Sequence, residues 1–258
     1  MRRLIVLLLL SVSPLCADTH LALTPGEEFT FRVSWGVFGN AGEIKINART
    51  ETNDQQPCTV IATTTSTRGF LRGLFPFDAR AESVFSNHTG RMLVHTERSA
   101  QGKKPSDTML TFNYGNGTAD FQDLIQPEKS QAVTMPPGDP MDLITCLVQT
   151  RSWNLKPGDQ RDVLVMFEEE PYELTFHALR YEKLTTRLGT FNTLVLEPRM
   201  EKTPPKGMFK RGSNVRVWIS QDDRHLPVKF EVEFKFGAGI STLTDYTEPP
   251  VANANPRP

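Results

Sequence analysis

The chain has 258 residues, 38% of them hydrophobic and 23% charged. It can therefore bury a core, and wholesale disorder is excluded. The 29 Lys and Arg residues nearly balance the 30 Asp and Glu residues, which argues against a protein that binds nucleic acid by neutralising phosphates. Proline (19) and glycine (17) are slightly above average usage, which suits many turns rather than long helices.

The first 17 residues have the order of a secretory signal peptide. Arg2 and Arg3 precede the aliphatic run 4–10, and the small-residue stretch that follows ends at Ala17. The run is too short to cross a bilayer, which needs roughly 20 residues. We expect cleavage after Ala17, giving a soluble periplasmic or secreted protein with a net charge of −3 instead of −1. Cys16 follows Leu15 rather than a small residue, so we expect ordinary cleavage rather than an outer-membrane lipoprotein.

Two cysteines remain in the expected mature chain, Cys58 and Cys146. An even pair in an exported chain can form a disulfide. The alternative is two buried free thiols, because free cysteine behaves as a small hydrophobe. Sequence separation does not decide between them.

Strand patterns with period two recur along the mature chain. They predict mainly antiparallel strands, each with one buried and one solvated face. In the range 228–235, for example, Val228, Phe230 and Val232 alternate with charged residues. Asn40 and Gly42 indicate a turn between the first two strands, and Gly115–Gly117 indicates a tight turn. The predicted strands cover 28–35, 43–48, 60–65, 110–114, 118–121, 163–167, 172–178, 193–197, 215–220, 228–234 and 239–243.

One helix is predicted near 139–153, between two strand-rich halves. Asp139 can cap it, and Pro140 suits its first turn. Ile144, Leu147 and Val148 share one face. The fold class is therefore all-β: a curved antiparallel sheet forming a roll, half-barrel or sandwich, with this helix inserted. We expect a single domain over 18–247 and a disordered proline-rich tail over 248–258.

The segment 68–77 is the main candidate for ligand binding. Its large apolar residues are interrupted by two glycines and a proline, which fits neither a regular strand nor a long helix. It either completes the core as a connector or forms an apolar lip that receives an acyl chain or a hydrophobic partner segment. In the second case its arginines would meet a phosphate or carboxylate head group. The candidate residues are Arg68, Phe70, Leu71, Arg72, Leu74, Phe75 and Phe77.

No catalytic constellation is evident in the sequence. Ser220, Asp222 and His225 fall within one predicted hairpin, whereas the members of known triads come from separate elements. The turn also has only one histidine for a metal. We interpret it as a structural turn in which an aspartate bonds backbone N–H groups and Arg224. We predict no catalytic residues, no metal and no cofactor.

Four stretches carry a resemblance to a known family. They comprise Gly26–Trp35 with Ala41–Gly42, Asp142–Arg151 with Leu155–Asp159, Thr185–Phe191 with Pro198, and Trp218–Val228. In these stretches the chain resembles an uncharacterised exported bacterial family, the domain of unknown function 3108, over nearly all of the mature sequence. The resemblance implies a mostly β envelope protein and no established chemistry. Its motif residues, which we interpret as structural, are Gly26, Glu27, Trp35, Gly42, Asp142, Arg151, Gly158, Asp159, Gly189, Phe191, Trp218, Ser220, Asp222 and Pro227.

The C-terminal part is also similar, more loosely, to the end of the periplasmic half-barrel lipoprotein carriers. Trp218, Asp222, Leu226–Pro227, Gly239 and Leu243–Tyr246 occur in the same order. This likeness is one of architecture and is a weak guide to function.

We therefore expect non-catalytic binding or chaperoning of an apolar or lipid-linked envelope component. The expected partners are a lipid, a lipoprotein or another envelope protein. The alternative is an interaction scaffold for envelope assembly. An apolar cavity of a few hundred Å³ would favour the carrier, and a packed interior would favour the scaffold. An enzyme, the third class, would need polar residues such as Asp222, His177 and Glu197 to converge in one cleft.

Overall fold

The computed structural model describes residues 21–53, 55–205, 209, 214–234 and 237–250. In these residues, fifteen strands form one sheet in the order β8-β7-β6-β5-β4-β3-β2-β1-β15-β14-β13-β12-β11-β10-β9. Every neighbouring pair is antiparallel except β9 and β10. The mainly antiparallel all-β prediction is thus confirmed. The predicted signal peptide lies outside the described residues, as do residues 251–258 of the predicted tail.

Strand β1 is the middle strand in the sheet order. It pairs with β2 on one side and with β15 on the other. The first arm runs from β2 to β8 and the second from β15 to β9. The elements are β1 (Glu28–Trp35), β2 (Phe38–Asn53), β3 (Gln56–Thr67), α1 (Gly69–Leu74), β4 (Phe77–Ser86), β5 (Met92–Gln101), β6 (Lys104–Asn113), β7 (Thr118–Asp123), η1 (Pro127–Lys129), β8 (Gln131–Thr134), β9 (Met141–Asp142), α2 (Leu143–Gln149), η2 (Thr150–Ser152), β10 (Gln160–Phe167), β11 (Glu170–Thr186), β12 (Gly189–Arg199), β13 (Asn214–Ser220), β14 (Pro227–Phe234) and β15 (Gly237–Thr247).

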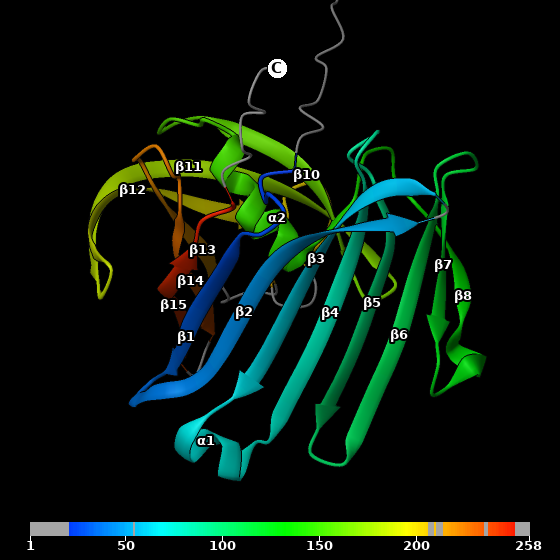
Figure 1. Ribbon diagram of the computed structural model, residues 1–258, viewed down its shortest axis with the longest axis horizontal. Helices are drawn as coiled ribbons and strands as arrows, with labels where there is room; N and C mark the ends of the chain where they lie inside the picture. Colours follow the sequence, from blue (N-terminus) through cyan, green and yellow to red (C-terminus); the bar gives the residue numbers. More distant parts are fainter. Residues whose placement is uncertain (1–20, 54, 206–208, 210–213, 235–236, 251–258) are drawn as a thin grey trace, which may run out of the picture.

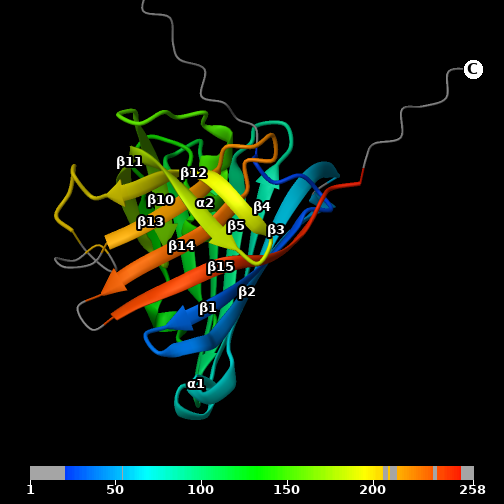
Figure 2. The same cartoon turned by 90° about the vertical axis from the view of Figure 1, so that its left-hand side faces the viewer.

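The sheet is strongly curved, and α2 lies inside the curve between its two arms (Figures 1 and 2). The two outer edges, β8 and β9, are consecutive in sequence and joined by residues 135–140. The curvature brings both arms onto α2, so a single sheet can bury its inner face without a second sheet. No helix in the described part of the chain is both long and apolar enough to cross a membrane.

The period-two patterns place the core as predicted. Phe29 and Phe31 of β1 and Val228 of β14 are fully buried. One predicted turn is displaced: β1 and β2 are joined at Gly36–Val37, and Asn40 and Gly42 lie inside β2. Gly42 is needed there for close packing, because a Cβ at this position would lie 2.8 Å from the carbonyl oxygen of Ser66.

The predicted helix is present but begins later than expected. Helix α2 covers Leu143–Gln149 and continues as η2 to Ser152, and its N-cap is Asp142 rather than Asp139. The Asp142 carboxylate accepts the Thr145 N–H at 2.9 Å, as a capping side chain does. Asp139 instead pairs with Arg91, so Asp139 and Pro140 belong to the preceding connection.

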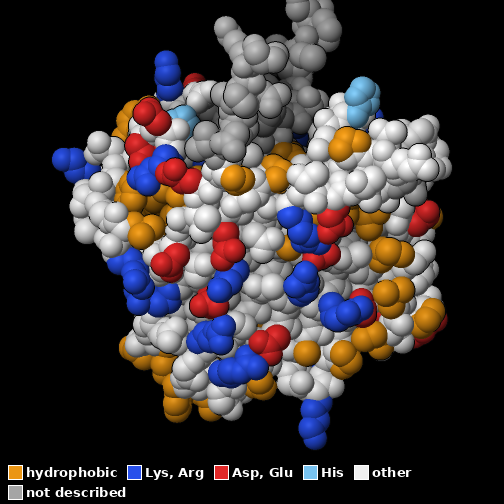
Figure 3. Space-filling view, in the orientation of Figure 1, with side chains coloured by type: hydrophobic (Ala, Val, Ile, Leu, Met, Phe, Trp, Pro, Cys, Tyr) orange, Lys and Arg blue, Asp and Glu red, His pale blue; other side chains and the backbone are white. Residues whose placement is uncertain are grey.

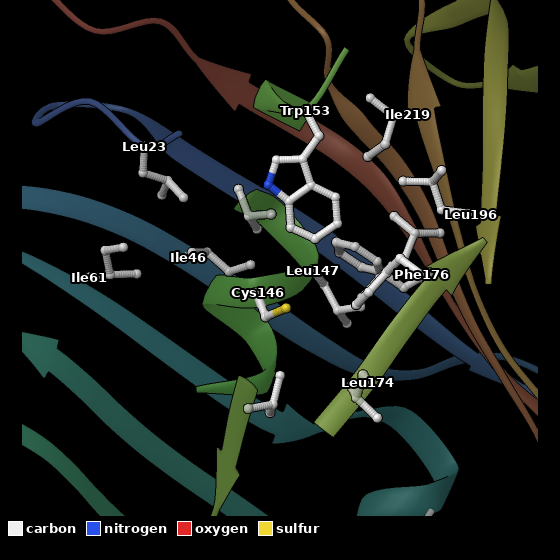
Figure 4. Packing of buried hydrophobic residues seen from close by; sticks show 14 of the residues in the cluster. Leu23, Ile46, Ile61, Cys146, Leu147, Trp153, Leu174, Phe176, Leu196 and Ile219 are labelled. Carbon is white, nitrogen blue, oxygen red and sulfur yellow. The ribbon is translucent and has the colours of Figure 1, made fainter. Parts of the chain in front are cut away.

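The core is one continuous cluster in which α2 contacts both arms of the sheet. Cys146 and Leu147 of α2 lie among Ile46 and Ile61 of the first arm and Phe176 and Leu196 of the second (Figure 4). Trp153 packs edge-on against Phe176 with ring centroids 5.1 Å apart. Side chains therefore fill the space between the arms where α2 lies, as in other protein interiors.

Both cysteines are buried free thiols in the structure, so the disulfide alternative is not formed. Cys146 belongs to the core cluster together with Ile61 of β3. Side chains alternate along a strand, so Cys58, three residues before Ile61, points to the opposite face of the sheet. Burial in apolar surroundings, with the Asp142 charge nearby, raises the pKa of the Cys146 thiol well above its usual value.

We predict that neither thiol reacts with Ellman's reagent in the native protein, because both are buried and Cys146 is kept protonated. In denaturant without reductant, two thiols should react in the chain that begins at residue 18, which lacks Cys16. A count of zero in denaturant would mean that a disulfide forms and would contradict this assignment.

Candidate functional site

Three of the four family-resembling stretches meet around η2. Arg151 of η2 donates to the Glu27 carboxylate at 2.8 Å, and the Tyr246 hydroxyl donates to the same carboxylate oxygen at 2.7 Å. The other Glu27 oxygen accepts the Thr24 N–H at 2.8 Å. The side chains of Glu27 and Arg151 are only 3% and 11% exposed. We call Glu27, Arg151 and Tyr246 the buried ion-pair network.

This network joins η2 to the middle of the sheet. Arg151 also donates to the backbone carbonyls of Ala22 and Arg224, at 3.2 and 2.6 Å. Its guanidinium carbon lies 5.4 Å from the centre of the Phe29 ring. Burial and the hydrogen bond to Glu27 raise the pKa of Tyr246 to about 12, so this hydroxyl remains a donor at any physiological pH. The polar groups of Glu27, Arg151 and Tyr246 thus bond to one another and to the backbone around η2. These contacts support the interpretation of Glu27 and Arg151 as structural residues.

The turn between β13 and β14 is held by its own hydrogen bonds and by a contact with η2. The Ser220 hydroxyl donates to Asp222 at 2.6 Å and accepts the Leu226 N–H at 2.7 Å. Burial opposes ionisation of Asp222, but hydrogen bonds from Ser220 and Arg224 hold the pKa of its carboxyl below the usual value. His225 lies 3.1 Å, through Nδ1, from the Arg151 carbonyl, so the turn also packs onto η2.

The remaining motif residues are spread over the sheet and its turns. Trp218 is buried, donates to Glu182 and lies under the Lys229 ammonium. Asp159 accepts the Lys156 N–H in the turn before β10. The others are Gly26 before β1, Trp35 at the end of β1, Gly158 in the Lys156–Asp159 turn, Gly189 and Phe191 at the start of β12, and Pro227 at the start of β14.

Sequence reasoning missed a serine–histidine–aspartate cluster at the start of α2. Ser83 of β4 lies 2.6 Å from Asp142 and 2.8 Å from His95 Nδ1 on β5. The serine, rather than the histidine, is the middle member. Its single proton goes to the carboxylate, so His95 must donate to Ser83 and cannot act as its base. Ser83 is only 2% exposed, and the cluster serves to hold the capping Asp142.

The other polar residues considered for catalysis are engaged separately. His177 and Glu197 are cross-strand partners on β11 and β12. His177 contacts Glu201, whereas Glu197 pairs with Arg199 and Arg216. Asp222 lies in the β13–β14 turn with Ser220 and Arg224. Among the described residues, no group of three His, Cys, Asp or Glu side chains is placed to hold a metal ion.

The predicted apolar segment 68–77 forms α1 and the start of β4, at the end of the β3 and β4 strands (Figure 1). Phe70, Leu74 and Phe75 are 67%, 57% and 60% exposed, and no residue of α1 is buried. The alternative prediction, that this segment is a connector whose side chains complete the core, is therefore wrong for these three side chains. Leu71 and Phe77 are half-buried. Arg68 pairs with Glu43, and Arg72 forms a bidentate pair with Asp78.

The connection between the two edge strands, residues 135–140, marks the place where the sheet does not close, and we call this region the seam. Two hollows lie there, one on each side of Pro137–Gly138. The first has a volume of about 290 Å³ and is bounded by β10 residues 161–164, Trp153, Met141 and Lys202. The second, of about 260 Å³, is bounded by Arg91, Phe112, Tyr114 and residues 135–138. By contrast, a small apolar pocket beside Leu143, Val165 and Tyr172 has only about 70 Å³.

The first hollow runs along an open strand edge. Strand β9 pairs with β10 only at Val165 and Met166, so among the described strands residues 160–164 of β10 have β11 as their only neighbour. The N–H and C=O groups of alternate residues in an antiparallel strand point to opposite sides. Every second residue of this edge thus directs its backbone groups away from β11.

The family model of the protein of unknown function DUF3108 matches residues 30–244. The chain belongs to the DUF3108 family. Among curated proteins no relative matches the sequence. The family assignment is consistent with the motif stretches that meet at η2.

The fold resembles that of a solved β-barrel-like protein of domain of unknown function 1849 from Brucella abortus. That likeness has a TM-score of 0.54 at 6% identity and covers 87% of this chain and 98% of the other. A DUF1089 protein from Pseudomonas aeruginosa gives 0.37 at 9% identity over 80% and 90% of the two chains. A protein from Bacteroides fragilis, described as exported and YmcC-like in fold, gives 0.35 at 11% identity over 88% and 97%. The first comparison shows a shared fold, and the looser two support no comparison of sites.

We predict that Arg151→Met destabilises the protein by about 3–5 kcal/mol, because it leaves the Glu27 charge buried without its partner. Urea unfolding measures this change. The double variant Glu27→Gln, Arg151→Met should recover part of the loss. Arg98→Met, which breaks the exposed pair with Asp107, is the matched control and should cost less than about 1 kcal/mol. Equal losses for Arg151→Met and Arg98→Met would contradict the role of the network.

Proposed function

We propose that this DUF3108 protein is a non-catalytic interaction protein of the bacterial cell envelope, and that it binds an extended segment of a partner protein at the seam. The observation that carries the proposal is the edge of β10, residues 160–164, which no strand in the described part of the chain covers and which lies beside the hollow of about 290 Å³. Location in the envelope rests on the signal-peptide pattern of residues 1–17.

The packing around α2 favours interaction over internal carriage of a lipid. Core side chains surround α2 on both arms, and the small apolar pocket beside Leu143 has about 70 Å³, whereas ligand pockets usually have about 300–1,000 Å³. The larger hollows at the seam are open and have polar as well as apolar walls. The mixed lining suits a polypeptide better than an acyl chain.

An extended peptide fits the β10 edge by strand addition. Proteins usually cover or interrupt strand edges, because free N–H and C=O groups pair readily with other chains. Main-chain hydrogen bonds to such an edge supply affinity, and neighbouring pockets select alternate side chains. Here Trp153 and Met141 give the hollow apolar surface. Its charged side chains are of both signs: Arg161 and Lys202 with Asp139, Asp162 and Glu173.

The test compares two substitutions of one residue, Asp162. Asp162→Ala removes the side chain that Thr175 and Lys202 contact but keeps the backbone N–H. Asp162→Pro removes the N–H as well, and proline is tolerated on edge strands. Peptides are first selected from a displayed random library against the wild-type protein, and their dissociation constants are then measured by fluorescence anisotropy.

We expect Asp162→Ala to bind the selected peptides nearly as well as the wild type. Asp162→Pro should bind them roughly ten-fold or more weakly, because an incoming strand loses one hydrogen bond and leaves a carbonyl unsatisfied. Both variants should melt within a few degrees of each other, which shows that the edge strand is intact. Failure to select any peptide, or equal binding by the two variants, would overturn the proposal.

A further inference from the structure

The most exposed apolar cluster of the described surface lies far from the seam, at the ends of β1 to β4 where the β1–β2 turn and α1 are found. It combines α1 with the β1–β2 turn: Val37 is 93% exposed, and Phe38 stacks on Phe70 with ring centroids 5.6 Å apart. In Figure 3, hydrophobic side chains gather at this lower end of the molecule. We call Val37, Phe38, Phe70, Leu74 and Phe75 the apolar tip.

Specific contacts hold the tip in a defined conformation. Thr67 accepts the Phe77 N–H at 3.0 Å and donates to the Phe75 carbonyl at 2.9 Å, which closes the base of α1. Gly69 lies so near β2 that a Cβ would be 2.8 Å from the Asn40 carbonyl oxygen, and its φ is +55°. A six-residue helix is unstable alone, so these contacts hold in place a helix that contributes no buried side chain to the core.

Two lysines lie on one side of the tip. The β5–β6 turn adjoins it, because the Gly102 N–H donates to the Pro76 carbonyl at 2.8 Å. This turn adds the exposed Lys103 and Lys104. Arg68 and Arg72, beside the tip, are balanced by Glu43 and Asp78. The two lysines therefore leave the surroundings of the tip positively charged on a chain whose net charge is −1.

We infer that the apolar tip docks on the surface of an anionic lipid bilayer. The aromatic and aliphatic side chains would enter the interface between head groups and acyl chains, and the lysines would lie against anionic head groups. Apolar side chains beside basic ones are the combination that binds peripheral proteins to such surfaces. The contact seats the protein on a membrane and leaves the seam, at another part of the sheet, open to a partner.

Vesicle sedimentation tests the inference. The chain from residue 18, which holds every described element, is mixed with vesicles of phosphatidylglycerol and phosphatidylcholine in equal parts, or of phosphatidylcholine alone. We expect binding to the anionic vesicles that weakens with added salt, and much weaker binding to the neutral ones. Phe70→Ser with Phe75→Ser should weaken binding about a hundred-fold, and Lys103→Gln with Lys104→Gln about twenty-fold.

The matched control replaces Leu124 and Ile125, which are 53% and 45% exposed near the β8 edge, by serine. This variant should bind vesicles like the wild type, and so should Asp162→Pro, which separates the tip from the seam. The substituted side chains of the tip, of the lysine pair and of Leu124 and Ile125 are exposed, so unchanged melting temperatures are expected for these three variants. The inference is overturned if the wild type remains in the supernatant with anionic vesicles, or if the Phe70→Ser, Phe75→Ser variant sediments as the wild type does.

Discussion

Buried polar contacts hold the short α2–η2 segment at both ends, and the arrangement of the sheet depends on them. At its start, Asp142 caps α2 and accepts the Ser83 hydroxyl of β4. At its end, Arg151 pairs with Glu27 beside β1. Polar groups at these depths are costly unless partnered, so the segment has one favourable position. The two arms of the sheet can then pack on its apolar side chains in a fixed geometry.

This arrangement explains why the functional candidates lie on the perimeter. A sheet of fifteen strands could enclose a cavity, as large barrels do, but α2, η2 and Trp153 occupy the space between the arms. Two features of the described surface remain as candidates for binding: the edge of β10 that no described strand covers, and the apolar tip at α1, between β3 and β4. The fold therefore supports surface recognition better than storage of a ligand.

Patterns in the local sequence predicted those structural features that depend on neighbouring residues alone. Alternation identified strands such as β1 and β14, because one face of each is buried whatever its neighbours. The prominence of residues 68–77 was also readable, since five large apolar side chains fall within eight positions. The start of α2 was not: Asp139–Pro140 is a good local capping sequence, but Ser83, 59 residues from Asp142, selects the later cap. The Glu27–Arg151 pair spans 124 residues and follows only from the central place of β1.

The open edge of β10 shows how a few residues determine a feature that no local pattern reveals. The sequence predicts an ordinary strand over 163–167, which the structure extends back to Gln160. Why residues 160–164 have no second neighbour among the described strands depends on why β9 has only two residues. In the parallel register, extending β9 backwards would place Pro140, Gly138 and Pro137 opposite the start of β10. Prolines lack the N–H that a ladder requires, and Gly138 has a φ of +139°, outside the strand region. Forwards, the Asp142 cap begins the helix. Asp142, which positions α2, therefore also ends β9 and leaves residues 160–164 without a second neighbour among the described strands.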